Sequence, residues 1–168
     1  MKKLSDDIRL VIFDADGTLR RRKDGQNKAP LANDEWELMP GIEEAIESIR
    51  HLPITFGIAS NQSCVGRGEI TYSMALLFLI HLKHELNLFV ENNPIQMCPH
   101  LPGICSCRKP QPGMLYAIMM YWEVSPSQTL FVGDSDTDAQ AAMQAGVSFM
   151  FTKDFLEKEQ KLWKQHYY

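Results

Sequence analysis

The sequence predicts an α/β fold of three layers, in which helices cover both faces of a central parallel sheet. Short apolar segments alternate along the chain with helical segments, which is the pattern of buried parallel strands joined by right-handed crossover helices. Small polar or acidic residues follow three of the predicted strands. Open sheets of this kind bind their ligands at the carboxyl ends of the strands.

The composition is that of one globular domain. The chain has 168 residues, of which 45% are hydrophobic and 23% charged, and we expect residues 1–168 to share one core. The net charge of −4 lacks the basic excess of a general nucleic-acid binder. The first residues lack an apolar signal core and the run 74–80 is far shorter than a membrane span, so we expect a cytoplasmic protein without a membrane partner.

The first predicted strand, residues 8–13, ends in two carboxylates, Asp14 and Asp16. In an extended segment, two Asp separated by one residue can point at one small volume, where like charges destabilise each other unless a cation is bound. Gly17 permits a sharp turn after them. Taken alone, the pattern indicates a divalent metal site and an Asx-type turn about equally.

The next elements follow from apolar periodicity. Residues 19–39 are polar and irregular and predict a long loop or small flap. A helix is predicted over 40–51, with Ile42, Ala45, Ile46 and Ile49 on one face. A strand over 54–59 leads into the polar residues Ser60, Asn61 and Gln62.

The second half continues the alternation. A long helix is predicted over 68–86, and its apolar run at 74–80 favours packing on more than one side within the core over a dimer contact, so we expect a monomer. A weak strand is predicted over 88–90, a helix over 113–122 and a strand over 129–132 that ends in Gly133 and Asp134. A short helix to Ala145 and a last strand over 147–151 follow, and the charged tail 153–168 is predicted to be helical without a functional role.

A cysteine-rich loop predicts a zinc site. Within ten positions the chain supplies three thiols and one imidazole, from Cys98, His100, Cys105 and Cys107, the ligand set of a closed tetrahedral zinc site. A closed site has no open coordination position, so this zinc would be structural and would fold the loop 98–107. The alternative is free thiols beside a surface histidine. Cys64 lies outside the cluster and receives no role.

Taken together, the polar residues at the strand ends and Lys109 resemble the motifs of the haloacid dehalogenase superfamily. The first motif matches Asp14-x-Asp16-Gly17-Thr18, the second Ser60, the third Lys109, and the fourth Gly133-Asp134-x-x-x-Asp138. The match runs in order over residues 11–151 and implies a Rossmann-like fold of that superfamily. Singly, Ser60 would be interpreted as a helix cap and Lys109 as an exposed cation.

The resemblance implies a division of roles among the carboxylates. Asp14 would attack phosphorus to give an aspartyl-phosphate, and Asp16 would protonate the leaving alkoxide and later activate water. Mg²⁺ would be bound by Asp14, the backbone carbonyl of Asp16 and Asp134, with Asp138 positioning that shell or ligating in it. Phosphoryl oxygens would be held by Ser60 and Lys109.

The cysteine loop together with the following Arg108-Lys109-Pro110 resembles one subfamily, the histidinol-phosphate and heptose-1,7-bisphosphate phosphatases, which have little or no cap domain. The resemblance implies that Arg108 contacts the substrate, with Asn61 and Gln62 beside it. The chain departs from both enzymes at Ala15, where an arginine is usual, and in its basic run, Arg20 to Lys23. Those four residues could recruit a second negative charge of the substrate, or could form a solvated basic turn.

The sequence thus predicts a Mg²⁺-dependent phosphomonoesterase that acts on a small phosphorylated metabolite, of the sugar phosphate, sugar bisphosphate or histidinol phosphate type. Two alternatives remain. A polynucleotide 3′-phosphatase would share the chemistry and use the basic flap, although the acidic net charge disfavours it. A phosphate-binding module without catalysis is disfavoured by the complete set of motif residues. The identity of the substrate depends on loop geometry, which residue identity does not determine.

Overall fold

The central element is a five-stranded parallel sheet with the order β5-β4-β1-β6-β7. The computed structural model describes residues 7–26, 28–88 and 93–157. The strands are β1 (Leu10–Phe13), β4 (Thr55–Asn61), β5 (Ile95–Cys98), β6 (Thr129–Gly133) and β7 (Ser148–Phe151). Because β1 lies in the middle of the sheet, the acidic segment that follows it lies between the ends of β4 and β6.

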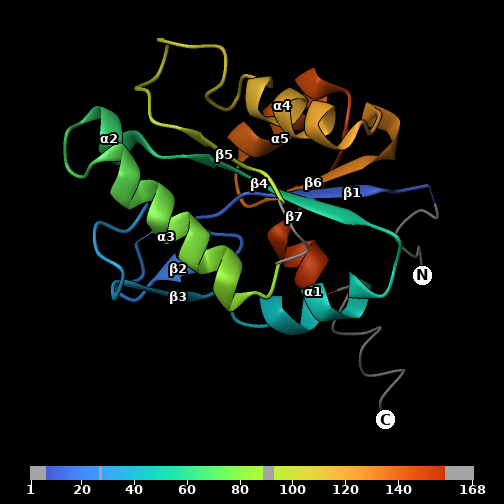
Figure 1. Ribbon diagram of the computed structural model, residues 1–168, viewed down its shortest axis with the longest axis horizontal. Helices are drawn as coiled ribbons and strands as arrows, with labels where there is room; N and C mark the ends of the chain where they lie inside the picture. Colours follow the sequence, from blue (N-terminus) through green and yellow to red (C-terminus); the bar gives the residue numbers. More distant parts are fainter. Residues whose placement is uncertain (1–6, 27, 89–92, 158–168) are drawn as a thin grey trace.

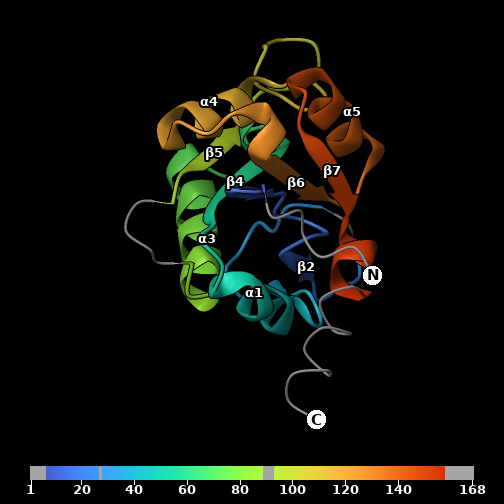
Figure 2. The same cartoon turned by 90° about the vertical axis from the view of Figure 1, so that its right-hand side faces the viewer.

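Helices cover both faces of the sheet, as predicted. The helices α4 (Gly113–Trp122) and α5 (Asp136–Ala145) lie on one face, and α1 (Ile42–Arg50) and α3 (Tyr72–Glu85) lie on the other (Figures 1 and 2). A short helix, α2 (Ser63–Gly66), follows β4, and a 3₁₀ turn, η1 (Pro126–Gln128), precedes β6. The predicted three-layer fold is confirmed.

Two apolar cores result from the alternation of side chains along β1. Val11 and Phe13 are fully buried against α1 and α3, whereas Leu10 and Ile12 are fully buried against α4 and α5. Successive residues of a strand point to opposite faces, so an unbroken apolar run is what a strand covered on both sides requires. This double burial fixes the end of β1 at the middle of the sheet.

The segment 19–39, predicted as a loop or small flap, contains an antiparallel hairpin of β2 (Arg20–Arg22) and β3 (Trp36–Leu38). It forms a separate two-stranded sheet, with Arg20 opposite Leu38. The hairpin begins four residues after Asp16, so its first strand is tied directly to the end of β1.

Most elements agree with the predicted ranges, with three differences. β4 extends to Asn61, so Ser60 and Asn61 are the last residues of the strand. The third strand is β5, downstream of the predicted strand 88–90, and residues 89–92 lie outside the described part. The tail is helical over 152–157, and the rest of it lies outside the described residues as well.

The long apolar helix is buried on one face only, which corrects the prediction that it packs on more than one side. Ala75, Phe78, Leu79 and Leu82 are buried, whereas Met74, Leu77 and Ile80 are 42%, 60% and 43% exposed. The physical reason is that α3 lies at the outside of its layer, where residues three and four apart define a single contact stripe. In the described part of the chain, no helix combines the length and the apolar content needed to cross a membrane.

Candidate active site

A polar cleft of about 300 Å³ lies at the carboxyl ends of the three neighbouring strands β4, β1 and β6. Each strand places polar side chains there, as the sequence predicts. The cleft is lined by Asp14, Asp16, Lys28, Ala29, Ser60, Asn61, Ser63, Cys64, Arg67, Arg108, Lys109, Asp134, Ser135, Thr137 and Asp138. Residues separated by more than a hundred positions thus meet in one cavity.

Lys109 lies at the floor of this cleft and is only 3% exposed. Its ammonium forms ion pairs with Asp14 and, at 2.7 Å, with Asp138 Oδ1, and it donates a hydrogen bond to the Ala59 carbonyl at 2.8 Å. Burial lowers the pKa of Lys109, but the adjacent carboxylates of Asp14 and Asp138 outweigh burial and raise it. The ammonium is therefore charged at neutral pH.

The carboxylates of Asp14, Asp134 and Asp138 converge, with one oxygen of each within 4.8 Å of the others. Burial, opposed by Lys109 and reinforced by Asp138, raises the pKa of Asp14 to about 7. A divalent cation beside the three carboxylates would relieve this penalty, and oxygen donors are the ligands that Mg²⁺ prefers. The donor set therefore fits the predicted magnesium.

Asp138 is held in place by the start of α5. Its Oδ2 accepts hydrogen bonds from the Ser135 backbone N–H at 3.1 Å and from the Ser135 hydroxyl at 2.5 Å. The bond from the Ser135 N–H, together with the bond from the Asp138 N–H to the Ser135 side chain, forms a capping box. At Gly133, an added Cβ would lie 2.5 Å from Asp138 Cβ. The absence of a side chain at Gly133 is therefore what lets Asp138 approach the end of β6.

Asp16 is held by two side chains behind the cleft. Arg20 Nε donates to Asp16 Oδ1 at 2.7 Å, and Gln62 Nε2 donates to Asp16 Oδ2 at 2.6 Å. Gln62 Nε2 also lies 2.8 Å from Ser60 Oγ, and Gln62 is 1% exposed. Gln62 is thus not among the residues that line the cleft, and the structure places it behind the predicted substrate contacts.

Asn61 and Lys109 fix each other through the backbone. Asn61 Nδ2 donates to the Lys109 carbonyl at 3.0 Å, and the Lys109 N–H donates to Asn61 Oδ1 at 3.1 Å. Arg108 lines the cleft and donates to the His100 carbonyl at 3.2 Å. The end of β4 therefore holds the segment that follows the cysteine loop.

The basic run does not meet the expectation of a substrate-facing patch. Arg20 is buried against Asp16, Arg21 pairs with Glu37 at 2.7 Å, and Arg22 pairs with Asp24 and Glu35. None of the four basic residues is among those lining the cleft. Acidic residues of the same hairpin neutralise Arg21 and Arg22, and Asp16 neutralises Arg20. The cations on the rim of the cleft are Lys28, Arg67 and Arg108.

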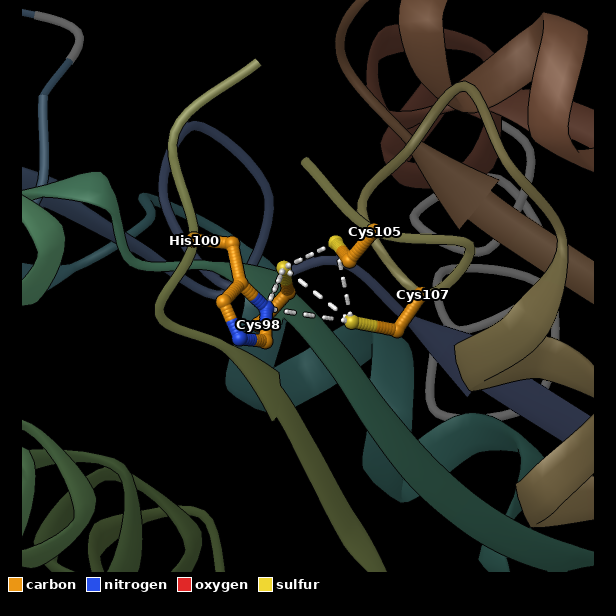
Figure 3. A group of neighbouring side chains, drawn as sticks. All are labelled: Cys98, His100, Cys105 and Cys107. Atoms are coloured by element: carbon orange, nitrogen blue, oxygen red, sulfur yellow. Dashed lines mark hydrogen bonds between the residues drawn. The ribbon is translucent and has the colours of Figure 1, made fainter. Parts of the chain in front are cut away.

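The four predicted zinc ligands lie together at the end of β5 and in the loop after it. Figure 3 shows the three sulfurs and the imidazole of His100 pointing at a common centre. The Sγ atoms of Cys98, Cys105 and Cys107 are 3.2–3.5 Å apart, and His100 Nδ1 lies 3.5 Å and 3.6 Å from the sulfurs of Cys107 and Cys98. All three cysteines are free thiols, so they are not joined as a disulfide.

The fold and the site together define the class of this protein. A family model described as haloacid dehalogenase-like hydrolase matches residues 20–152, and the chain belongs to this family. The predicted resemblance is confirmed.

Within the family, the chain is similar to heptose bisphosphate phosphatases. It is 35% identical to the D-glycero-beta-D-manno-heptose-1,7-bisphosphate 7-phosphatase of Pseudomonas putida over 87% of this chain and 83% of that protein. It is 38% identical to the enzyme of the same name from Bordetella bronchiseptica over 83% and 77%. The crystal structure of D,D-heptose 1,7-bisphosphate phosphatase from B. bronchiseptica, complexed with magnesium and phosphate, superposes with a TM-score of 0.77 and 28% identity over 94% and 99%. The prediction of a phosphatase of this family is confirmed.

Two features of the cleft were not found from the sequence. The first is the ion pair between Arg20 and Asp16. Their spacing of four residues could have indicated it, but Arg20 was interpreted together with the rest of the basic run. Lys28 and Arg67 stand isolated in loops, and a charged loop residue is ordinarily solvated. Only the folded chain brings these two cations to the same rim.

Proposed function

We propose that this chain is a Mg²⁺-dependent phosphomonoesterase for a small phosphorylated sugar, and that Asp14 is its nucleophile. The observation that carries the proposal is the buried group of Asp14, Lys109 and Asp138 at the end of the central strand. Burying a charge costs free energy unless the charge is paired and hydrogen-bonded. Here the Asp14 carboxylate lies at the floor of the cleft beside the Lys109 ammonium. Asp134 and Asp138 lie close enough to bind the same metal ion.

The reaction proceeds in two balanced displacements. An oxygen of Asp14 forms a bond to phosphorus while the bond to the ester oxygen breaks, and Asp16 delivers its proton to the departing alkoxide. Asp16 then accepts a proton from water as that water attacks the aspartyl-phosphate, which releases inorganic phosphate and restores Asp14. Lys109 and Ser60 hold the phosphoryl oxygens.

The carboxylates of Asp14, Asp134 and Asp138 would hold Mg²⁺, with the backbone carbonyl of Asp16 as the further predicted ligand. When bound, the metal supplies positive charge that offsets the repulsion between phosphate and carboxylate. The magnesium in the related structure from B. bronchiseptica supports this assignment.

A structural Zn²⁺ would be held by Cys98, His100, Cys105 and Cys107. A tetrahedron with Zn–S bonds of about 2.3 Å has edges of about 3.8 Å, close to the observed separations of 3.2–3.6 Å. Because the cysteine loop precedes Arg108 and Lys109, zinc would fix the two cations in the cleft.

The substrate class is supported by the charge of the rim. Arg108, Lys28 and Arg67 line the cleft on the side of the loops, and a guanidinium binds a phosphate through paired hydrogen bonds. The relatives named above are bisphosphate phosphatases. A sugar that carries a second phosphate therefore fits this cleft better than a monophosphate.

The test is phosphate release from a panel of esters. The panel contains D-glycero-β-D-manno-heptose 1,7-bisphosphate, hexose bisphosphates and monophosphates, histidinol phosphate and a 3′-phosphorylated oligonucleotide, each with Mg²⁺ and with a chelator. We expect Mg²⁺-dependent hydrolysis with the highest kcat/KM for a sugar bisphosphate. In Asp134→Asn, which removes a carboxylate that would bind Mg²⁺, we expect this hydrolysis to be lost. Asp136→Asn, which changes an exposed carboxylate two residues away, is the control and should keep it. Preference for the oligonucleotide, or turnover that resists the chelator, would contradict the proposal.

A further inference from the structure

A buried guanidinium lies behind the cleft and holds Asp16. Arg20 is 1% exposed, and its Nε and Nη2 lie 2.7 Å and 3.4 Å from the two carboxylate oxygens of Asp16. Gln62 donates to Oδ2 at 2.6 Å. Both oxygens of Asp16 are thus held by donors behind the cleft, while the side chain, 15% exposed, reaches the cleft.

The backbone between the two residues reinforces this arrangement. The Gly17 N–H donates to the Arg20 carbonyl at 2.8 Å, and the Arg20 N–H donates to the Ala15 carbonyl at 3.0 Å. Gly17 has a φ of 96°, which a residue with a side chain rarely adopts. The turn that joins β1 to the hairpin is therefore closed, and it presents Arg20 to Asp16 at a fixed distance.

Packing alone explains Arg20 poorly. Its Nη1 is buried and has no hydrogen-bond partner in the described part of the chain, and its guanidinium lies 5.5 Å from the ring centre of Trp36. A buried donor without a partner costs stability. The space beside Trp36 therefore does not by itself account for a guanidinium at this position, whereas the contacts with Asp16 do.

We propose that Arg20 is a positioning residue for Asp16. With Gln62, it sets the direction of the carboxylate, so that the proton of Asp16 reaches the oxygen of the leaving alkoxide. It also ties that carboxylate to the hairpin, since Arg20 is the first residue of β2. This inference rests on the proposed function, in which Asp16 is the acid and base.

The inference has a consequence that depends on the leaving group. A sugar alkoxide is a strong base and must be protonated as it departs, whereas 4-nitrophenolate is stabilised as an anion and leaves without a proton. Misplacing Asp16 should therefore slow the first displacement for a sugar phosphate and leave it nearly unchanged for p-nitrophenyl phosphate. A general loss of structure would slow both equally.

The test measures kcat/KM for D-glycero-β-D-manno-heptose 1,7-bisphosphate and for p-nitrophenyl phosphate on the same enzyme preparation, and takes their ratio. The ratio does not depend on the folded fraction, because both values scale with it. In Arg20→Met we expect the ratio to fall by about tenfold, a part of the 10²–10⁴ that general acid catalysis contributes. In Arg20→Lys, which keeps the charge but not the planar fork, we expect a fall of about threefold.

Arg21→Gln is the matched control, since Arg21 is exposed on the same strand and pairs with Glu37; its ratio should equal that of the wild type. Equal falls for both esters, or an unchanged ratio in both Arg20 variants, would overturn the inference. If Arg20→Met gives no soluble enzyme, the ratio in Arg20→Lys decides alone. Failure of the proposed function is distinguishable, because the wild type would then show no Mg²⁺-dependent hydrolysis of the sugar bisphosphate, whatever its activity on p-nitrophenyl phosphate.

Discussion

Replacing Lys109 by methionine removes the cation between two buried carboxylates and keeps the length of the side chain. Asp14 and Asp138 are 6% and 1% exposed, so both would remain buried without the ammonium that pairs with them. Removing one member of a buried ion pair costs about 3–5 kcal/mol. In a domain of this size about 1 kcal/mol corresponds to about 2–4 °C in Tm, so we expect Tm to fall by roughly 6–20 °C at pH 8 without metal.

The fall should shrink at pH 5. There Asp14, whose pKa is about 7 in the folded protein, carries a proton and no longer needs a cation. The assay is thermal unfolding of both proteins in a chelator at the two pH values, with urea unfolding as a second measure. Lys153→Met is the matched control, since the Lys153 side chain is 83% exposed and lies 4.0 Å from Glu157, and its Tm should stay unchanged. A Lys109→Met protein as stable as the wild type at pH 8 would refute the account of the buried charges.

Three further predictions follow from the same geometry. Burial raises the pKa of Asp14 from 3.8 to about 7, so the metal-free protein should lose stability as the pH rises from 4 through 7. The gain in Tm on adding Mg²⁺ should therefore be larger at pH 8 than at pH 5.5, and equal gains would contradict this. Cys105→Ser should remove bound zinc, measured by elemental analysis, and lower Tm, whereas Cys64→Ser should keep the zinc; zinc retained in Cys105→Ser would argue against the site. Gly133→Ala should lower kcat by at least about tenfold by displacing Asp138, and wild-type kcat would refute that role.

The strands and the position of the two carboxylates after β1 were predictable because their signals are local. The run over β1 must be apolar to be buried on both faces, and Asp14 and Asp16 follow it directly. The four predicted zinc ligands, from Cys98 to Cys107, lie within ten positions and need no tertiary information to be recognised together. Such patterns can be recognised from residues that are close in the sequence, without knowledge of the fold.

The features that were missed depend on which residues meet across the fold. The outer face of α3 also carries large apolar side chains, so Leu77 is exposed because no other described element covers it, not because of its type. Arg20 belongs to a basic run that resembles a solvated surface, and only the closed turn after Asp16 buries it. The three cations on the rim of the cleft, Lys28, Arg67 and Arg108, come from the hairpin loop, the end of α2 and the segment after the cysteine loop. Only the folded chain brings them together.

The central claim, that Asp14 forms a covalent bond to phosphorus, can be tested by rapid quench. The wild-type enzyme is mixed with Mg²⁺ and a sugar bisphosphate, stopped in acid during turnover, digested and analysed by mass spectrometry. We expect a phosphoryl group on the peptide that contains Asp14, lost on treatment with hydroxylamine, and neither this adduct nor phosphate release in Asp14→Asn. Full turnover by Asp14→Asn, or a phosphoryl group on another residue, would contradict the account.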